Sequence, residues 1–189
     1  MKKTTILLFF LAVLGIVAGC KPSATKANDN DADSTQTSES AAQQDSTVYG
    51  VCTEGAMHTL VMKAEDGKVY TFEIDMDDSI TVMGGILEGD QMAVTYRVDD
   101  MQDTIATKVI NLTTLEANWS SLDKNFEIQK GGTVQSHQQG ETQPWTSWRI
   151  FNGHLVLNKD TFDIDRLDDD SLFLENRDGI YAYSRVIKK

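Results

Sequence analysis

The feature that most limits the fold of this chain is a succession of short β-patterned runs from Val48 onward. The runs are rich in β-branched and aromatic residues, and Gly, Asp and Asn turns separate them. Only 2 prolines occur in the 189 residues, so little interrupts the pairing of strands. The pattern predicts an all-β protein.

Five of these runs lie in the first half: Val48–Glu54, Met57–Ala64, Lys68–Ile74, Gln91–Val98 and Asp103–Asn111. A three-residue loop that ends with Gly67 in the left-handed conformation would pair Leu60 with Phe72 and Met62 with Tyr70. A two-residue loop would instead mix polar and apolar residues on one face. We expect the first register because it places the large apolar residues together.

In the second half, Asn152-Gly153 is typical of a two-residue type I′ turn. This turn pairs Trp148 with Leu157 and Ile150 with Leu155, and these four side chains then share the core face.

A second hairpin turn is expected at Arg177–Ile180. It would set Leu174 opposite Tyr183 and Leu172 opposite Arg185.

The N-terminus is typical of a secretory signal peptide, with Lys2 and Lys3 before the apolar run Ile6–Val17. The run is shorter than the about 20 apolar residues that a permanent transmembrane helix needs. Val17-Ala18-Gly19-Cys20 resembles the lipobox of bacterial lipoproteins. That resemblance implies cleavage before Cys20, lipid such as palmitate on Cys20, and anchoring in the outer membrane, facing the periplasm or the cell surface. The alternative is an ordinary signal peptide with a chance cysteine.

The residues after Cys20 predict a disordered tether. Lys21–Thr47 contains no Leu, Ile, Val, Phe, Tyr or Trp, so it cannot bury enough apolar surface to offset the entropy lost on ordering. We expect it to make few contacts with the folded part.

Composition limits the partners. Without the signal peptide, the chain has 15 basic and 29 acidic side chains, a net charge of −14. This argues against nucleic acid as a partner, because phosphate binding depends on Lys and Arg. With Cys20 lipidated, Cys52 is the one remaining thiol, and we expect it to be a buried, unpaired hydrophobe.

Motifs for catalysis or metal binding are lacking. His58, His137 and His154 are far apart in the sequence, and no nucleophile elbow, HExxH motif or phosphate loop occurs. We therefore expect no enzyme, cofactor or metal. The alternative is a calcium site in the acidic cluster between Asp160 and Asp170, although alternation along a strand explains Asp163 and Asp165 equally well.

Two family resemblances refine the fold class. Gly84-Gly85 followed by Leu87–Tyr96 resembles the OB-like barrels of bacterial envelope lipoproteins. The run from Gly131 through the Trp148–Leu157 hairpin to Tyr183-Ser184-Arg185 resembles their lipocalin-like domains. The resemblances imply two small antiparallel barrels.

These resemblances also imply one structural contact. Lipocalin relatives close the base of the barrel with a tryptophan and an arginine, in the positions of Trp119 and Arg185. The expected domains are a signal peptide at 1–19, a lipidated tether at 20–47, an OB-like barrel at 48–115 and a lipocalin-like barrel at 116–189.

The expected function is that of a non-catalytic, membrane-anchored lipoprotein that acts as a binding or adaptor module. Two alternatives stay open. In one, the lipocalin-like barrel carries a small apolar ligand. In the other, the chain is similar to envelope-stress lipoproteins that join the same two barrel types in the reverse order.

Overall fold

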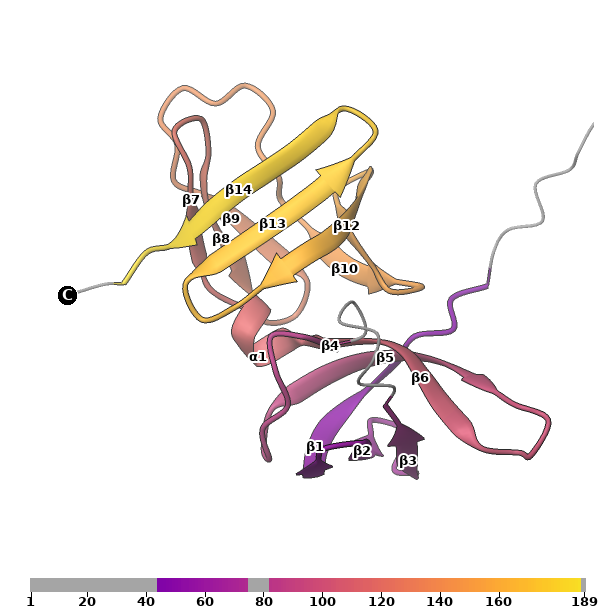
Figure 1. Ribbon diagram of the computed structural model, residues 1–189. Coiled ribbons are helices and arrows are strands. Elements are labelled where there is room, and N and C mark those ends of the chain that lie inside the picture. The colour runs from indigo at the N-terminus through magenta and orange to yellow at the C-terminus, as the bar shows by residue number, and fades with distance from the viewer. Residues whose placement is uncertain (1–43, 75–81, 188–189) are drawn as a thin grey trace, which may run out of the picture. The chain divides into compact units, whose positions relative to one another are not determined.

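The computed structural model describes residues 44–74 and 82–187, which belong to one compact unit that runs from Ala42 to Lys189. The predictions for the signal peptide, for Cys20 and for the tether up to residue 43 lie outside the described residues. Within them, the predicted all-β fold class is confirmed, and the strands form two barrels joined by one helical turn (Figure 1).

The first barrel is a mixed sheet, not a purely antiparallel one as expected. Its strands are β1 (Val48–Ala56), β2 (Thr59–Ala64), β3 (Val69–Glu73), β4 (Val82–Met83), β5 (Gln91–Val98) and β6 (Thr104–Asn111). They follow the order β3-β2-β1-β5-β6-β4, and β3 also pairs with β6. The pairings of β6 with β3 and β4 are parallel. A parallel pair needs a crossover connection, which local hairpin patterns do not reveal.

The second barrel is antiparallel and nearly closed. Its strands are β7 (Asn118–Ser120), β8 (Asn125–Gln129), β9 (Thr133–Ser136), β10 (Trp148–Phe151), β11 (His154–Leu157), β12 (Asp160–Leu167), β13 (Ser171–Asn176) and β14 (Gly179–Arg185). The order is β10-β11-β12-β13-β14-β7-β8-β9. A bridge between Thr133 and Ser147 joins the two outer strands, and the Trp148 amide donates to the Gly132 carbonyl at 2.8 Å.

Two of the predicted registers are confirmed. Leu60 faces Phe72 and Met62 faces Tyr70, with Gly67 at φ 85°. Across β10 and β11, Trp148 faces Leu157 and Ile150 faces Leu155, and Asn152 and Gly153 both have positive φ, as a type I′ turn requires.

The predicted register of β13 and β14 is wrong by two residues. Leu172 faces Tyr183 and Asn176 faces Gly179, so the loop is Arg177-Asp178. The Asn176 side chain explains the shift, because its Oδ1 accepts a hydrogen bond from the Asp178 amide at 2.8 Å and forms the turn one step earlier. A shift of two residues keeps every side chain on its predicted face.

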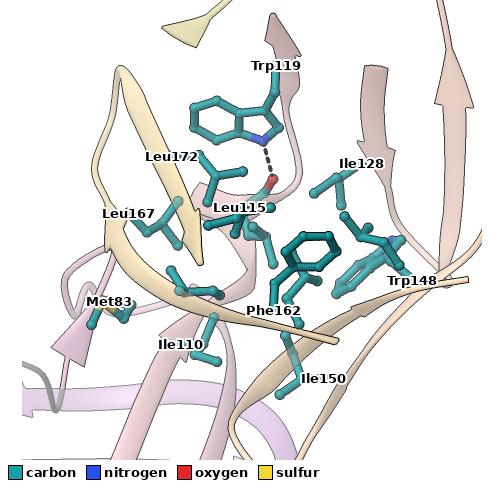
Figure 2. Close-up of a cluster of buried hydrophobic side chains, with 14 of the residues drawn as sticks. Met83, Ile110, Leu115, Trp119, Ile128, Trp148, Ile150, Phe162, Leu167 and Leu172 are labelled. Carbon is teal, nitrogen blue, oxygen red and sulfur yellow. Dashed lines mark hydrogen bonds between the residues drawn. The ribbon is translucent and has the colours of Figure 1, made fainter. Parts of the chain in front are cut away.

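The larger core fills the second barrel and continues through α1 (Leu112–Leu115) into the first (Figure 2). Trp119 is fully buried at its base, and its Nε1 donates to the Leu115 carbonyl at 2.9 Å. Met83, Ala93 and Ile110 of the first barrel belong to the same cluster. A smaller core lies inside the first barrel and includes Cys52, Leu60, Met62, Phe72, Met92, Val94 and Val109.

Polar contacts also join the barrels. The Tyr49 hydroxyl donates to the Ile150 carbonyl at 2.6 Å, and the Gly84 amide donates to the Leu167 carbonyl at 2.9 Å. The Gly153 turn lies against Lys108, since a Cβ at Gly153 would be 3.2 Å from Lys108 Cδ.

Residues 44–47, the described end of the expected tether, contact the second barrel. The Ser46 amide and hydroxyl each donate to Asn152 Oδ1 at 2.8 Å, and the Asn152 amide donates to Thr47 Oγ1 at 3.0 Å. The expectation of few contacts is therefore wrong for these residues. Polar side chains and turn amides make the contact, and the lack of apolar residues does not prevent it.

Candidate ligand-binding site

The turns of the second barrel fall into two groups, because successive antiparallel strands turn at alternate ends. Residues 121–124, 137–147, 158–159 and 177–178 lie at one end, called here the open end (Figure 1). The turns at 130–132, 152–153 and 168–170 lie at the other end, which includes the Gly153 contact with Lys108.

A pocket of about 900 Å³ lies at the open end. Four aromatic side chains line it: Trp145, Phe162, Tyr181 and Tyr183. The rings meet edge to face, with centroids 5.8 Å apart for Trp145 and Phe162 and 5.9 Å apart for Phe162 and Tyr181. A pocket of this volume, lined by aromatic rings and by several polar side chains, has features of a small-molecule site. It is called here the aromatic pocket.

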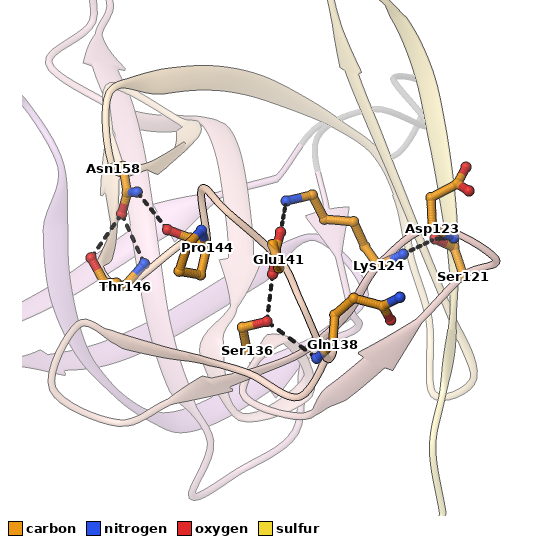
Figure 3. A network of polar contacts seen from close by, with 9 residues as sticks. All are labelled: Ser121, Asp123, Lys124, Ser136, Gln138, Glu141, Pro144, Thr146 and Asn158. Carbon is orange, nitrogen blue, oxygen red and sulfur yellow. Dashed lines mark hydrogen bonds and ion pairs between the residues drawn. The ribbon is translucent and has the colours of Figure 1, made fainter.

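Trp145 comes from the loop between β9 and β10, and a polar network holds that loop in place (Figure 3). Asn158 Oδ1 accepts hydrogen bonds from the Thr146 and Ser147 amides at 2.9 and 3.1 Å, and Asn158 Nδ2 donates to the Pro144 carbonyl at 3.2 Å. The φ of Asn158 is 55°, a left-handed conformation that Asn adopts more readily than most residues. These contacts fix the backbone on both sides of Trp145.

Glu141, which belongs to the same loop, also helps to hold it in place. Its carboxylate accepts hydrogen bonds from Lys124 Nζ and from the Ser136 hydroxyl. Burial alone would raise the pKa of Glu141, but these hydrogen bonds lower it below its ordinary value. Lys124 Nζ also lies 4.2 Å from the centroid of the Trp145 ring. The carboxylate and the indole therefore share one ammonium group.

Tyr183 lies at the base of the aromatic pocket, where Phe126 packs against it edge to face at 5.0 Å. Burial, with smaller effects of Tyr181 and Glu141, raises the pKa of Tyr183 to about 12. The phenol is therefore a neutral part of the pocket at physiological pH.

The residues selected from the sequence lie elsewhere. Asn152 and Gly153 form the turn at the other end of the barrel. The Arg185 guanidinium lies 5.1 Å from the Trp119 ring, so the expected contact is present, at the base of the core. Cys20 lies outside the described residues.

Cys52 is buried, 1% exposed, and unpaired among the described residues, as predicted. Burial raises the pKa of its thiol, which makes the thiol a poor nucleophile.

The acidic cluster does not assemble a calcium site. Across residues 44–74 and 82–187, no group of three or more His, Cys, Asp or Glu side chains could hold a metal ion. Asp163 lies instead 2.8 Å from His154 Nδ1 and 3.7 Å from Lys108 Nζ. Asp168 pairs with Arg166.

The sequence contains little sign of the aromatic pocket. Trp145 looks like one of several aromatics that could fill a short barrel, and Lys124 and Glu141 are separated by 16 residues of strand, turn and loop. Only the aromatic residue inside a polar, Gly- and Pro-containing loop could have pointed to this position.

Comparison of the chain with protein-family models, with curated proteins and with solved structures finds no match. Among the residues that the structure describes, no helix has the length and apolar character to cross a membrane.

Proposed function

We propose that this chain is a non-catalytic envelope lipoprotein, anchored in the outer membrane through lipid on Cys20, whose second barrel binds a small apolar ligand at its open end. The single observation that supports ligand binding is the aromatic pocket, about 900 Å³ in volume and lined by four aromatic side chains. The lipobox-like Val17–Cys20 supports the anchor.

The fold supports the finer family resemblances. The five strands β3-β2-β1-β5-β6, which the pairing of β3 with β6 closes into a ring, form a barrel of the size of an OB-like domain. The Trp119–Arg185 contact at the base of the second barrel is the one that lipocalin relatives make. Neither resemblance identifies a ligand, because proteins of one fold bind different ligands.

A protein adaptor is the second candidate function. Leu122 and Ile180 at the mouth of the pocket are 98% and 61% exposed, and exposed apolar residues around a hollow also suit a partner protein. An adaptor would use this rim and leave the interior of the pocket empty.

Binding to a neutral fluorescent probe, N-phenyl-1-naphthylamine, tests the ligand-binding proposal. We expect saturable binding that Ile180→Ser and Tyr181→Ala weaken. Val69→Ser is the matched control, because Val69 is 65% exposed against 61% for Ile180 but lies on β3 of the first barrel. Equal binding by all three variants, or no binding at all, would exclude the pocket as the site.

The anchor has its own test. Metabolic labelling with a palmitate analogue should mark the wild-type protein and leave Cys20→Ser unlabelled. Labelling of both proteins, or of neither, would contradict lipid attachment at Cys20.

A further inference from the structure

We propose that the aromatic pocket selects ligands with a cationic head on an apolar body. This inference rests on the proposed ligand-binding function and specifies the chemistry of the ligand.

The charges at the pocket mouth favour a cationic ligand. Four carboxylates line the pocket, from Asp123, Glu141, Asp160 and Asp178, against the single ammonium of Lys124. Lys124 is already paired with Glu141. The other three carboxylates make no ion pair within the described part of the chain.

The consequence is a negative potential at the mouth. Carboxylates beside a low-dielectric wall attract a cationic group and repel an anionic one. Lys159 and Arg177 line the adjacent polar cleft together with Asp160 and Asp178, and they weaken this potential. Asp163 and Glu175 line the same cleft, so carboxylates still outnumber cations around the pocket. A fatty-acid carboxylate is therefore disfavoured, although its chain would suit the interior.

The aromatic lining also favours a cationic ligand with an apolar body. The Lys124 ammonium 4.2 Å from the Trp145 ring centroid demonstrates that this indole face is placed to receive a cation. Tyr181 and Phe162 extend the aromatic surface from there. A quaternary ammonium of a ligand would displace the Lys124 ammonium from this ring face, and the apolar body of the ligand would lie against these rings.

The experiment compares three ligands with the same eight-carbon chain: octyltrimethylammonium, 1-octanol and octanoate. Binding is measured by calorimetry at 50 mM and 500 mM NaCl. We expect the cation to bind about tenfold more tightly than the alcohol, and octanoate to bind most weakly. The preference should decrease at the higher salt concentration, because salt screens the exposed carboxylates.

Two double variants locate the preference. Asp160→Asn with Asp178→Asn should abolish the advantage of the cation over the alcohol, measured as the ratio of the two affinities within the same variant. Asp100→Asn with Asp103→Asn is the control, since it makes the same change in net charge on exposed residues near β6 of the first barrel. Lys124→Met, which removes the competing ammonium, should strengthen binding of the cation.

The outcomes separate the two proposals. Equal affinities for the three ligands, or tightest binding of octanoate, would overturn the cationic preference and leave the apolar site intact. Equal losses in the two double variants would overturn it as well, because the preference would then come from the net charge alone. Absence of binding by all three ligands would overturn both proposals.

Discussion

The guanidinium of Arg185 lies 5.1 Å from the centroid of the Trp119 ring, and the two residues are also direct partners across β14 and β7. Arg185 donates a hydrogen bond from Nη2 to the Thr114 carbonyl in α1, and Trp119 Nε1 donates to the Leu115 carbonyl. One pair of side chains thus satisfies two carbonyls at the C-terminal end of α1 and covers the base of the larger core.

Arg185→Lys should therefore be more destabilising than an exchange of like charges suggests. A lysine loses the planar contact with the indole and the geometry of the bond to Thr114, so we expect a loss of about 1–2 kcal/mol in the free energy of unfolding. Arg97→Lys, at an exposed position of β5, is the control and should stay within about 0.5 kcal/mol. Equal effects of the two changes in urea unfolding would contradict a structural role for the Arg185 contact.

Local patterns in the sequence predicted most of the strands and two registers correctly. Asn152-Gly153 dictates its turn, because both residues adopt positive φ readily, and alternation then fixes the pairing of Ile150 with Leu155. The shifted register of β13 and β14 depends on one side-chain hydrogen bond, from the Asp178 amide to Asn176. The sequence allows a loop at Asp178-Gly179 or at Arg177-Asp178, and this one hydrogen bond favours the second.

The features that sequence reasoning missed are those made by distant residues. The parallel bridge between Glu73 and Ile105 joins strands that have β4 and β5 between them in the chain. The aromatic pocket requires Trp145 and Tyr181, from distant parts of the chain, to pack against the same Phe162 ring in a nearly closed barrel. Hydrophobic periodicity reports which face a residue occupies on its own strand, and it contains no information about such pairs.

The docking of residues 44–47 on Asn152 predicts a specific effect of that side chain. Asn152→Gly keeps the left-handed backbone, φ 48°, but removes the acceptor of both Ser46 hydrogen bonds. We expect a loss of about 1 kcal/mol in stability and faster amide exchange at Ser46. Asn152→Ala should cost about 1 kcal/mol more, because it adds left-handed strain. Unchanged exchange at Ser46 in Asn152→Gly would contradict the docking.

The same contact should depend on pH through Asp45. Burial alone would raise the pKa of this carboxyl, but hydrogen bonds from Thr47 and Asn152 lower it below its ordinary value. A lowered pKa in the folded state means that the stabilisation is present above about pH 4 and is lost as the pH falls further. Amide exchange at Thr47, corrected for its intrinsic pH dependence, should thus increase in acid for the wild type. Asp45→Asn should show no such increase.

Neighbouring glycines between β4 and β5 offer a matched test of the packing between the barrels. Gly84 and Gly85 both have positive φ, 84° and 75°. A Cβ at Gly84 would be 2.9 Å from Asn111 Cβ and 3.0 Å from Leu167 Cδ2, whereas a Cβ at Gly85 meets nothing within 4 Å. Gly85→Ala should cost about 1 kcal/mol from backbone strain alone. Gly84→Ala should cost about 1–3 kcal/mol more, because the Leu167 side chain of the second barrel must move. Equal losses in urea unfolding would show that this contact contributes nothing.

Cys52 should react with thiol reagents only when the first barrel opens. The side chain is 1% exposed, and burial raises the pKa of the thiol, so both access and ionisation are reduced. In a Cys20→Ser background, labelling of Cys52 should be at least about 100-fold slower than labelling of a cysteine moved to the exposed next position by Cys52→Ser with Thr53→Cys. Similar rates for the two positions would contradict the burial of Cys52.

Tyr183 should ionise later than a free tyrosine and should make stability depend on alkaline pH. Burial is the main cause that raises the pKa of its phenol from 10.0 to about 12. A raised pKa in the folded state means that the stabilisation is complete below pH 10 and is lost as the pH rises toward 12. The total loss for a shift of two units is about 2–3 kcal/mol. Tyr183→Phe has no proton to lose, so the free energy of unfolding of the wild type should fall relative to this variant by that amount between pH 9 and pH 12. Parallel losses of stability in the two proteins, measured by urea unfolding, would contradict the burial of the phenol at the base of the pocket.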